Sequence, residues 1–111
     1  MIREMTLAID CGGGGIKGSV VDERGTMMAP ARRVPTPYPL PPELLVETAV
    51  GLAKELPPAT RVTMGMPGMI RHGVVIATPH YITRDGPRSR VLPELVERWD
   101  HFDMGRAIEQ A

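Results

Sequence analysis

Four consecutive glycines, at positions 12–15, constrain the fold of this chain more than any other feature. An apolar run at residues 6–9 leads through Asp10 into the glycines, and a second β-type run at residues 16–21 follows them. Glycine loses more backbone freedom on folding than any other residue, and a turn between two strands needs far fewer of them. We therefore expect the loop to approach a bulky anion closely, with its N–H groups turned toward a phosphate.

The composition is that of a small protein built as one unit. The 111 residues form at most one domain, or part of a larger one, and 42% of them are hydrophobic. A net charge of zero gives no reason to expect binding to nucleic acid or to an anionic membrane. No apolar run reaches the ~18 residues of a membrane span, and no signal peptide precedes the first strand. A lone cysteine suits a reducing compartment, so we expect a soluble, cytoplasmic protein.

The first forty residues predict three antiparallel strands in sequence order, a meander. Residues 5–9 and 16–22 are the first two strands, and the glycine loop is the turn between them. Residues 22–26 form a polar turn in which Gly25 can adopt positive φ. Residues 27–34 then return as the third strand, antiparallel to the second.

A proline-rich connector at residues 35–42 separates this meander from a helix. Its five prolines favour extended backbone, and we interpret it as a crossover from sheet to helix rather than as a ligand for a peptide-binding domain. Pro42 suits the first turn of the helix, and Pro57 follows its end. The helix presents one apolar stripe, made of Leu45, Ala49, Leu52, Ala53 and Leu56.

The second half of the chain adds two strands and two short helices. Residues 61–66 predict a strand that lies parallel to the first one, because a helical crossover joins them. Residues 78–92 show no hydrophobic period and predict a long polar loop. Asp103 is the expected N-cap of the last helix. The other expected elements are a turn at 66–69, a strand at 73–77 and helices at 93–98 and 104–110.

Three side chains beside the glycines are candidates for chemistry. Asp10, at the end of a strand, can hold Mg²⁺ directly or through water, or it can cap the turn by accepting its N–H groups. Lys17 is either a point charge for a phosphate or a solvent-facing strand residue. Cys11 fits best as a small hydrophobic residue rather than as a reactive thiol.

The loop joins two strands, which excludes the commonest phosphate loops. Walker-type and dinucleotide-binding loops both open a helix, whereas a strand follows Lys17. A strand–loop–strand connection of this kind resembles the first phosphate motif of the actin, hexokinase and Hsp70 superfamily. Within it, Ile9-Asp10-Cys11-Gly12-Gly13-Gly14-Gly15-Ile16-Lys17-Gly18 is most similar to the ROK family of bacterial sugar kinases, and to its polyphosphate-using glucokinases in particular.

The resemblance extends along nearly the whole chain. The segment at 65–75, which begins Gly-Met-Pro-Gly, is similar to a Gly-x-Pro-Gly segment of that family, and 95–103 resembles a Trp-x-x-Phe-Asp stretch of some members. The resemblance implies an α/β fold, the N-terminal lobe of a ribonuclease H-like (actin-like ATPase) domain. Residues 1–111 would form part of that lobe, with a mixed sheet that combines the meander and the helical crossover.

The resemblance also implies roles for the residues beside the phosphate donor, ATP or polyphosphate. The glycines Gly12, Gly13, Gly14 and Gly15 would surround the donor phosphates. Asp10 would lie near Mg²⁺, and Lys17 would lie beside the anionic path. Three arginines of the long loop, Arg84, Arg88 and Arg90, are either contacts for a polyphosphate chain or part of a solvated loop.

On the sugar side, the resemblance implies a hexose, with glucose the expected substrate. Pro67 and Gly68 would line this side of the cleft. The family often has an Asn in the next loop that binds sugar hydroxyls, and His80 is the nearest occupant here, or else a surface residue. Members of the family are usually homodimers.

We expect little kinase turnover from this chain alone. The family's catalytic base is an Asp preceded by an Asn, and we expect it beyond residue 111. The alternative is a non-catalytic remnant, or a sugar-binding regulatory module on the same fold. The family's repressors carry a DNA-binding unit ahead of the first motif, whereas only five residues precede the strand here, so we expect no DNA binding.

Overall fold

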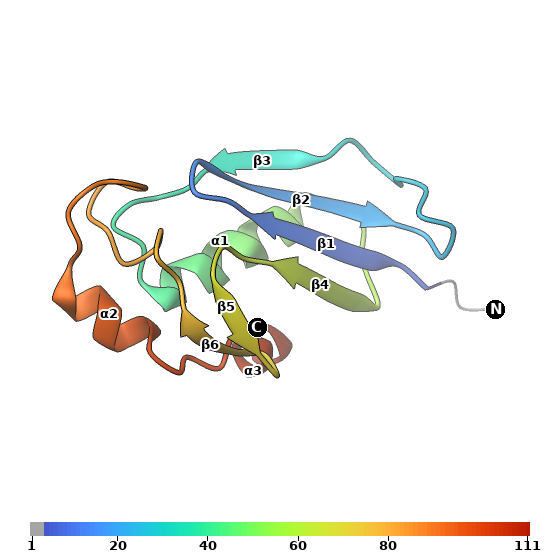
Figure 1. Ribbon diagram of the computed structural model, residues 1–111. Coiled ribbons are helices and arrows are strands. Elements are labelled where there is room, and N and C mark those ends of the chain that lie inside the picture. Colours follow the sequence, from blue (N-terminus) through green and yellow to red (C-terminus); the bar gives the residue numbers. More distant parts are fainter. Residues whose placement is uncertain (1–3) are drawn as a thin grey trace.

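The computed structural model describes residues 4–111, so the first three of the residues ahead of the first strand lie outside the described part. The chain forms a four-stranded sheet with one helix against a face, and a smaller two-stranded sheet with two short helices beside it (Figure 1). This arrangement confirms the predicted α/β class with a mixed sheet. None of the helices within residues 4–111 has the length and apolarity needed to cross a bilayer.

The main sheet places its strands in the order β3-β2-β1-β4. Its members are β1 (Thr6–Cys11), β2 (Gly15–Val21), β3 (Arg32–Pro35) and β4 (Arg61–Gly65). β1 pairs antiparallel with β2, β2 pairs antiparallel with β3, and β1 pairs parallel with β4. The parallel pair follows from the helical crossover between β3 and β4, as the sequence predicts.

Helix α1 (Pro42–Lys54) covers one face of this sheet, and Pro42 occupies its first turn. The predicted apolar stripe is buried at Leu45, Ala49 and Leu52. Leu52 and Leu56 also lie against Gly18 of β2, where a β-carbon would stand 3.5 Å and 3.3 Å from their side chains. The helix therefore packs closely on β2 because the strand has a glycine beneath it.

Two boundaries in the strands differ from the prediction. The third strand was expected from residue 27, but β3 begins only at Arg32, and Met27 forms an isolated bridge with Val21. Pro30 lies between Met27 and Arg32, and proline has no N–H to donate to a strand partner. The expected turn at 66–69 is also wrong at its end, because the chain enters a strand at residue 69.

That strand, β5 (Met69–Arg71), pairs antiparallel with β6 (Val74–Ala77) in the small sheet. Sequence reasoning found β6 and missed β5, since three residues are too few to show an alternating pattern. Helix α2 (Pro93–Trp99) and helix α3 (Met104–Gln110) follow as predicted. Asp103 caps α3, because its carboxylate accepts the Arg106 N–H at 3.0 Å.

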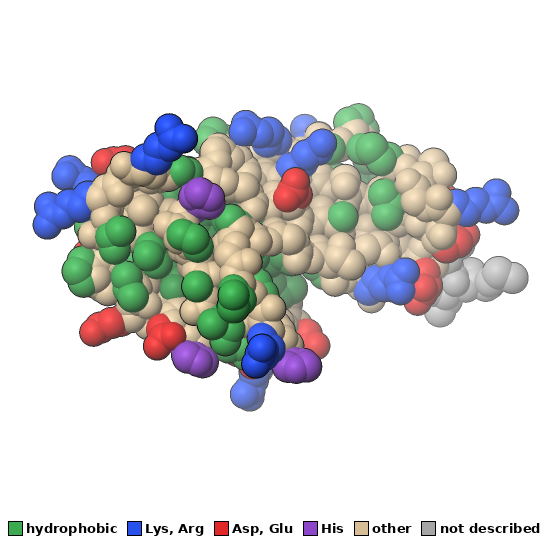
Figure 2. Space-filling model, in the orientation of Figure 1, with side chains coloured by type: hydrophobic (Ala, Val, Ile, Leu, Met, Phe, Trp, Pro, Cys, Tyr) green, Lys and Arg blue, Asp and Glu red, His purple; other side chains and the backbone are tan. Residues whose placement is uncertain are grey.

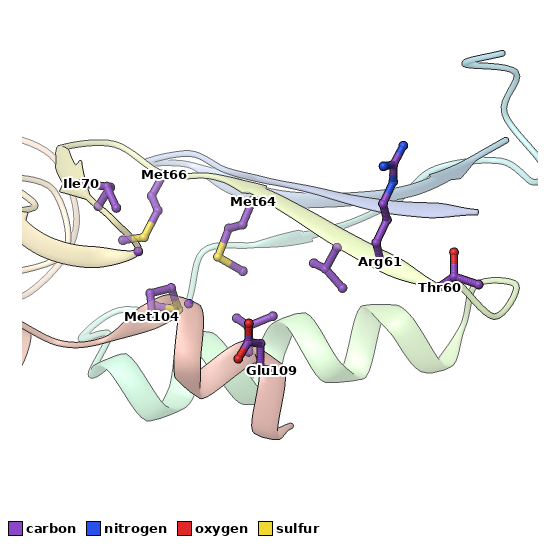
Figure 3. Close-up of a pocket in the computed structure, with 11 residues that line it drawn as sticks. Thr60, Arg61, Met64, Met66, Ile70, Met104 and Glu109 are labelled. Atoms are coloured by element: carbon purple, nitrogen blue, oxygen red, sulfur yellow. The ribbon is translucent and has the colours of Figure 1, made fainter. Parts of the chain in front are cut away.

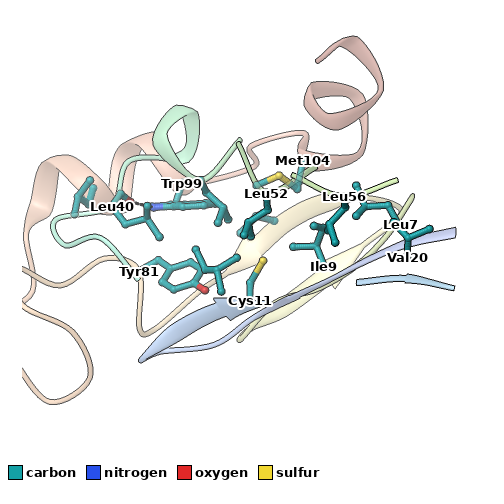
Figure 4. Packing of buried hydrophobic residues seen from close by; sticks show 14 residues of the cluster. Leu7, Ile9, Cys11, Val20, Leu40, Leu52, Leu56, Tyr81, Trp99 and Met104 are labelled. Atoms are coloured by element: carbon teal, nitrogen blue, oxygen red, sulfur yellow. Dashed lines mark hydrogen bonds between the residues drawn. The ribbon is translucent and has the colours of Figure 1, made fainter. Parts of the chain in front are cut away.

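The chain's four aromatic residues form a continuous row through one end of the core. Tyr38 and Tyr81 have ring centroids 6.4 Å apart, Tyr81 and Trp99 5.7 Å, and Trp99 and Phe102 5.9 Å. The Trp99 indole N–H donates to the Leu40 carbonyl at 2.8 Å. Figure 4 shows Leu40, Trp99 and Tyr81 grouped at one end of the buried cluster. The proline-rich connector is therefore part of the core.

A groove of about 610 Å³ lies between β4 and α3. Met64 of β4 and Met66, just after the strand, point toward Met104 of the helix, and Glu109 lies at the other end of the helix (Figure 3). None of the residues predicted to carry chemistry lines this groove. The candidate site is found elsewhere, at the end of β1.

Candidate functional site

The glycine loop connects β1 to β2 at the carboxyl end of β1. Because β4 runs parallel to β1, and Asp10 pairs with Gly65, the two strands end at the same edge of the sheet. Ligands of open α/β sheets bind outside the carboxyl ends of such strands. The loop and the Pro67–Gly68 segment that follows β4 both leave the sheet at this edge.

The loop is a tight turn whose Gly12 N–H donates to the Gly15 carbonyl at 2.9 Å. None of its four glycines has φ in the left-handed region. Their backbone conformations are therefore open to other residues, and the reason for glycine must lie in the space around each of them.

That space differs from one glycine to the next. A β-carbon at Gly13 would stand 2.8 Å from the Pro87 ring, and one at Gly15 would overlap the Arg33 guanidinium. A β-carbon at Gly14 would meet nothing within 4 Å. The Pro87 ring accounts for glycine at 13. The Arg33 guanidinium beside Gly15 is the end of an exposed, flexible side chain that can move aside, and no neighbour in residues 4–111 accounts for glycine at 14.

The carbonyl oxygens of the loop are held by hydroxyl and amide donors from two distant segments. The Gly12 carbonyl accepts from the Thr36 hydroxyl at 2.9 Å and from the Tyr81 hydroxyl at 2.8 Å. The Gly13 carbonyl accepts from the Tyr38 hydroxyl at 2.7 Å. The Gly14 carbonyl accepts from the Thr36 N–H at 3.3 Å.

The N–H groups of Gly13 and Gly14 are in the opposite situation. No group within residues 4–111 accepts a hydrogen bond from either of them. Backbone donors that remain unpaired in a fold need a partner from water or from a ligand. Successive N–H groups with their carbonyls turned away form a concavity suited to an anion. The loop therefore offers two N–H donors of the kind that bind phosphate oxygens.

Three charged side chains form a row across the sheet next to the loop. Asp10 of β1 pairs with Lys17 of β2, and Lys17 pairs with Arg33 of β3. All three side chains are exposed, and they alternate with buried neighbours such as Cys11 that face α1. Figure 2 shows Lys and Arg side chains along this part of the molecule, with an acidic side chain beside them.

Of the two roles open to Asp10, turn capping is not what the structure shows. Within residues 4–111 no loop N–H donates to the Asp10 carboxylate, whereas Asp22 does cap its turn, at 2.8 Å and 3.0 Å to two N–H groups. No three His, Cys, Asp or Glu side chains of the described residues come together as a metal cluster. One free carboxylate fits Mg²⁺, which usually binds one or two protein carboxylates together with water and phosphate oxygens.

Cys11 packs as a small apolar side chain. The thiol is buried, and burial, with a smaller contribution from the Asp10 charge, raises its pKa from 9.0 to about 12. Burial also raises the pKa of Tyr81, so its hydroxyl keeps the proton that it donates to Gly12. Neither group ionises near neutral pH.

The residues predicted on the sugar side lie in two places. The Thr78 hydroxyl donates to the Pro67 carbonyl at 2.9 Å, and Gly68 packs on Ala77. His80, half-buried, lies instead against the glycine loop, 3.7 Å from the position of a Gly13 β-carbon. The long loop thus connects the Pro-Gly segment to the phosphate loop.

Sequence reasoning missed the donors that hold the loop. Thr36 and Tyr38 stand within the proline-rich connector, and Tyr81 stands in a loop without period, so no spacing indicated them. The three arginines of that loop, Arg84, Arg88 and Arg90, are exposed, which agrees with the solvated alternative.

Comparison with known proteins adds an independent line of evidence. A ROK family glucokinase from Streptomyces griseus, solved in complex with glucose and AMPPNP, is 24% identical with a TM-score of 0.66, and the match covers 96% of this chain and 30% of that chain. A candidate N-acetylmannosamine kinase from Listeria monocytogenes is 21% identical with a TM-score of 0.61, covering 98% of this chain and 32% of that chain.

A candidate sugar kinase from Cytophaga hutchinsonii is 26% identical with a TM-score of 0.53, covering 84% of this chain and 31% of that chain. This chain therefore spans about a third of the length of these structures, and it shares their fold. Comparison with curated protein sequences gives no match. The sequence model of the ROK family matches residues 6–109, which is nearly the whole chain, and the chain therefore belongs to the ROK family.

Proposed function

We propose that this chain forms the phosphate-donor wall of a ROK-type sugar kinase, which transfers a phosphoryl group from ATP or polyphosphate to a hexose. One observation carries the proposal: the Gly13 and Gly14 N–H groups are unpaired within residues 4–111, while the carbonyls of the loop are held from behind. The glucokinase from Streptomyces griseus, similar in fold, binds glucose and AMPPNP.

On the donor side, the loop amides bind phosphate oxygens and Lys17 adds a positive charge. Asp10 holds Mg²⁺, which neutralises charge on the donor phosphates. Both side chains lie on the exposed face beside the loop. The adjacent Arg33 extends the positive charge across β3, which favours a donor with several phosphates.

On the sugar side, Pro67 and Gly68 border the cleft and His80 lies between the sugar and the donor. His80 lies 3.7 Å from the position of a Gly13 β-carbon, which supports this place because phosphoryl transfer needs the acceptor hydroxyl close to the donor phosphate. We propose glucose as the hexose, a homodimer as the assembly and the cytoplasm as the location.

We propose that residues 1–111 bind the phosphate donor and the sugar but do not catalyse phosphoryl transfer by themselves. Transfer needs a base within reach of the sugar hydroxyl, and the sequence contains no Asn and hence no Asn-Asp pair. The Asn-Asp base that the family resemblance implies is therefore not among residues 1–111.

The substitution Gly14→Ala tests the phosphate site. The β-carbon meets nothing within 4 Å, so the fold should be unchanged, but the methyl group would stand where the loop faces its ligand. We expect binding of Mg²⁺–ATP and of polyphosphate to weaken at least about tenfold, a loss typical of a charge-assisted contact. The measurement is a titration followed through the amide NMR signals of the loop.

Gly51→Ala is the matched control, because a β-carbon at this exposed helical glycine also meets nothing within 4 Å. It should bind the donor as the unaltered chain does, with the same thermal midpoint as Gly14→Ala or a higher one. Unchanged donor binding in Gly14→Ala would contradict the proposed site. If the unaltered chain responds to glucose but to neither donor, the sugar-binding regulatory alternative is favoured instead.

A further inference from the structure

Three hydroxyl groups hold the carbonyls of the glycine loop from behind. We propose that Tyr38, Tyr81 and Thr36 are positioning residues of the donor site, which turn the loop amides toward the phosphate by holding the loop carbonyls on the opposite side. This inference rests on the proposed phosphate site.

The planar peptide group couples each carbonyl to the N–H of the next residue. In a trans peptide the C=O of one residue and the N–H of the next point in opposite directions and rotate together. The bonds to the Gly12 carbonyl therefore orient the Gly13 N–H, and the bond to the Gly13 carbonyl orients the Gly14 N–H. Each hydroxyl thus fixes the direction of one particular N–H group.

The glycine loop needs such restraint from outside. A run of glycines has no side chains to fix its backbone, and each peptide can rotate more freely than in other residues. The loop's own hydrogen bond, from the Gly12 N–H to the Gly15 carbonyl, restrains the ends of the turn but leaves the orientation of the peptides that carry the Gly13 and Gly14 N–H groups open. The hydrogen bonds from outside the loop select it.

The two tyrosine donors are held rigidly. Tyr81 is fully buried, and its ring lies between those of Tyr38 and Trp99. Tyr38 is confined by Gly86, where a β-carbon would stand 3.2 Å from the ring. Two phenol rings held in this way present their hydroxyls at fixed points, which flexible side chains could not do.

The two tyrosines are not equivalent, and this difference makes the inference testable. The Gly12 carbonyl has two hydroxyl donors, Thr36 and Tyr81, whereas the Gly13 carbonyl has Tyr38 alone. Removal of the Tyr38 hydroxyl leaves the Gly13 carbonyl without a hydrogen-bond donor among residues 4–111. Removal of the Tyr81 hydroxyl leaves one donor in place.

The experiment compares Tyr38→Phe and Tyr81→Phe with the unaltered chain, using inorganic tripolyphosphate with Mg²⁺ as the probe. Both variants keep the ring and remove only the hydroxyl. We expect the dissociation constant to rise about tenfold in Tyr38→Phe, because the Gly13 carbonyl loses its hydrogen bond. We expect a rise of about threefold in Tyr81→Phe, because Thr36 still donates to the Gly12 carbonyl. The NMR response to the probe should fall most at the Gly14 amide in Tyr38→Phe and at the Gly13 amide in Tyr81→Phe.

Thr48→Val is the control, because its hydroxyl donates at 2.7 Å to the Leu44 carbonyl within α1, away from the loop. A general loss of stability would weaken binding in all three variants alike and would show no preference for one amide. If Tyr38→Phe does not fold, Tyr81→Phe gives the same test at Gly13.

Three outcomes overturn the inference, and they are distinguishable. If the unaltered chain binds tripolyphosphate and both tyrosine variants bind it equally well, the positioning role is wrong and the phosphate site stands. If the unaltered chain shows no response at the loop amides, the phosphate site itself is wrong and the positioning role fails with it. Equal weakening in Thr48→Val also contradicts the positioning role.

Discussion

Gly68 is a residue at which the backbone itself demands glycine. Its φ is +135°, and a β-carbon would overlap the Ala77 carbonyl oxygen. A side chain in this region of φ costs about 1–3 kcal/mol before any clash is counted. We expect Gly68→Ala to lower the free energy of unfolding by at least that amount in urea denaturation. Gly51→Ala should change it by less than about 1 kcal/mol, in the stabilising direction, and equal losses in the two variants would contradict this account.

Cys11 predicts a dependence of stability on alkaline pH. Burial raises the pKa of the thiol from 9.0 to about 12, so the folded chain holds this proton more tightly than the unfolded chain. The resulting stabilisation is complete below pH 9 and is lost as the pH rises toward 12. At pH 10 the loss should be about 1.4 kcal/mol.

The measurement is the difference in unfolding free energy between the unaltered chain and Cys11→Ala, at pH 7 and at pH 10. The variant retains both tyrosines, so their own titration cancels in the difference. A difference that stays constant between the two pH values would show that the thiol is more accessible than its burial indicates.

At the scale of elements, Trp99 links α2 to the proline-rich connector. Its indole N–H donates to the Leu40 carbonyl at 2.8 Å, and both residues are buried. Trp99→Phe keeps an aromatic ring but leaves that carbonyl unpaired, at an expected loss of about 1–3 kcal/mol. The urea midpoint, followed by far-ultraviolet circular dichroism, measures the loss.

The control for this variant is Val96→Ala on the same helix, because Val96 is 42% exposed. It should cost less than about 1 kcal/mol, as expected for a surface substitution. A Trp99→Phe variant no less stable than Val96→Ala would mean that the connector is held by packing alone.

The elements that sequence reasoning found are those with a long or repeated signal. Helix α1 has its apolar stripe over 13 residues, and β1 and β2 flank an unmistakable turn. β5 has three residues and was missed, and the start of β3 was placed too early because hydrophobic Met27 and Met28 precede Pro30. Both methionines are exposed, so hydrophobicity alone did not indicate burial there.

At the scale of the whole molecule, two separate sheets meet around one core. The main sheet carries the glycine loop, and the long segment between β6 and α2 folds back on it through His80, Tyr81 and Pro87. β4 is the outer strand on one side of the main sheet, beside the apolar groove between β4 and α3. The candidate site is thus assembled from segments up to 69 positions apart in the chain.

The sequence by itself determined the strand–glycine loop–strand unit, the crossover helix and the resemblance to ROK sugar kinases. These depend on local composition and periodicity, which are visible in neighbouring residues. Tertiary structure alone decided which glycine is open and which groups hold the loop. The Pro87 ring and the Arg33 guanidinium occupy the space beside Gly13 and Gly15, whereas the space beside Gly14 is open. The reason is that Tyr81 reaches Gly12 only when the chain returns, and no local pattern encodes a contact of that range.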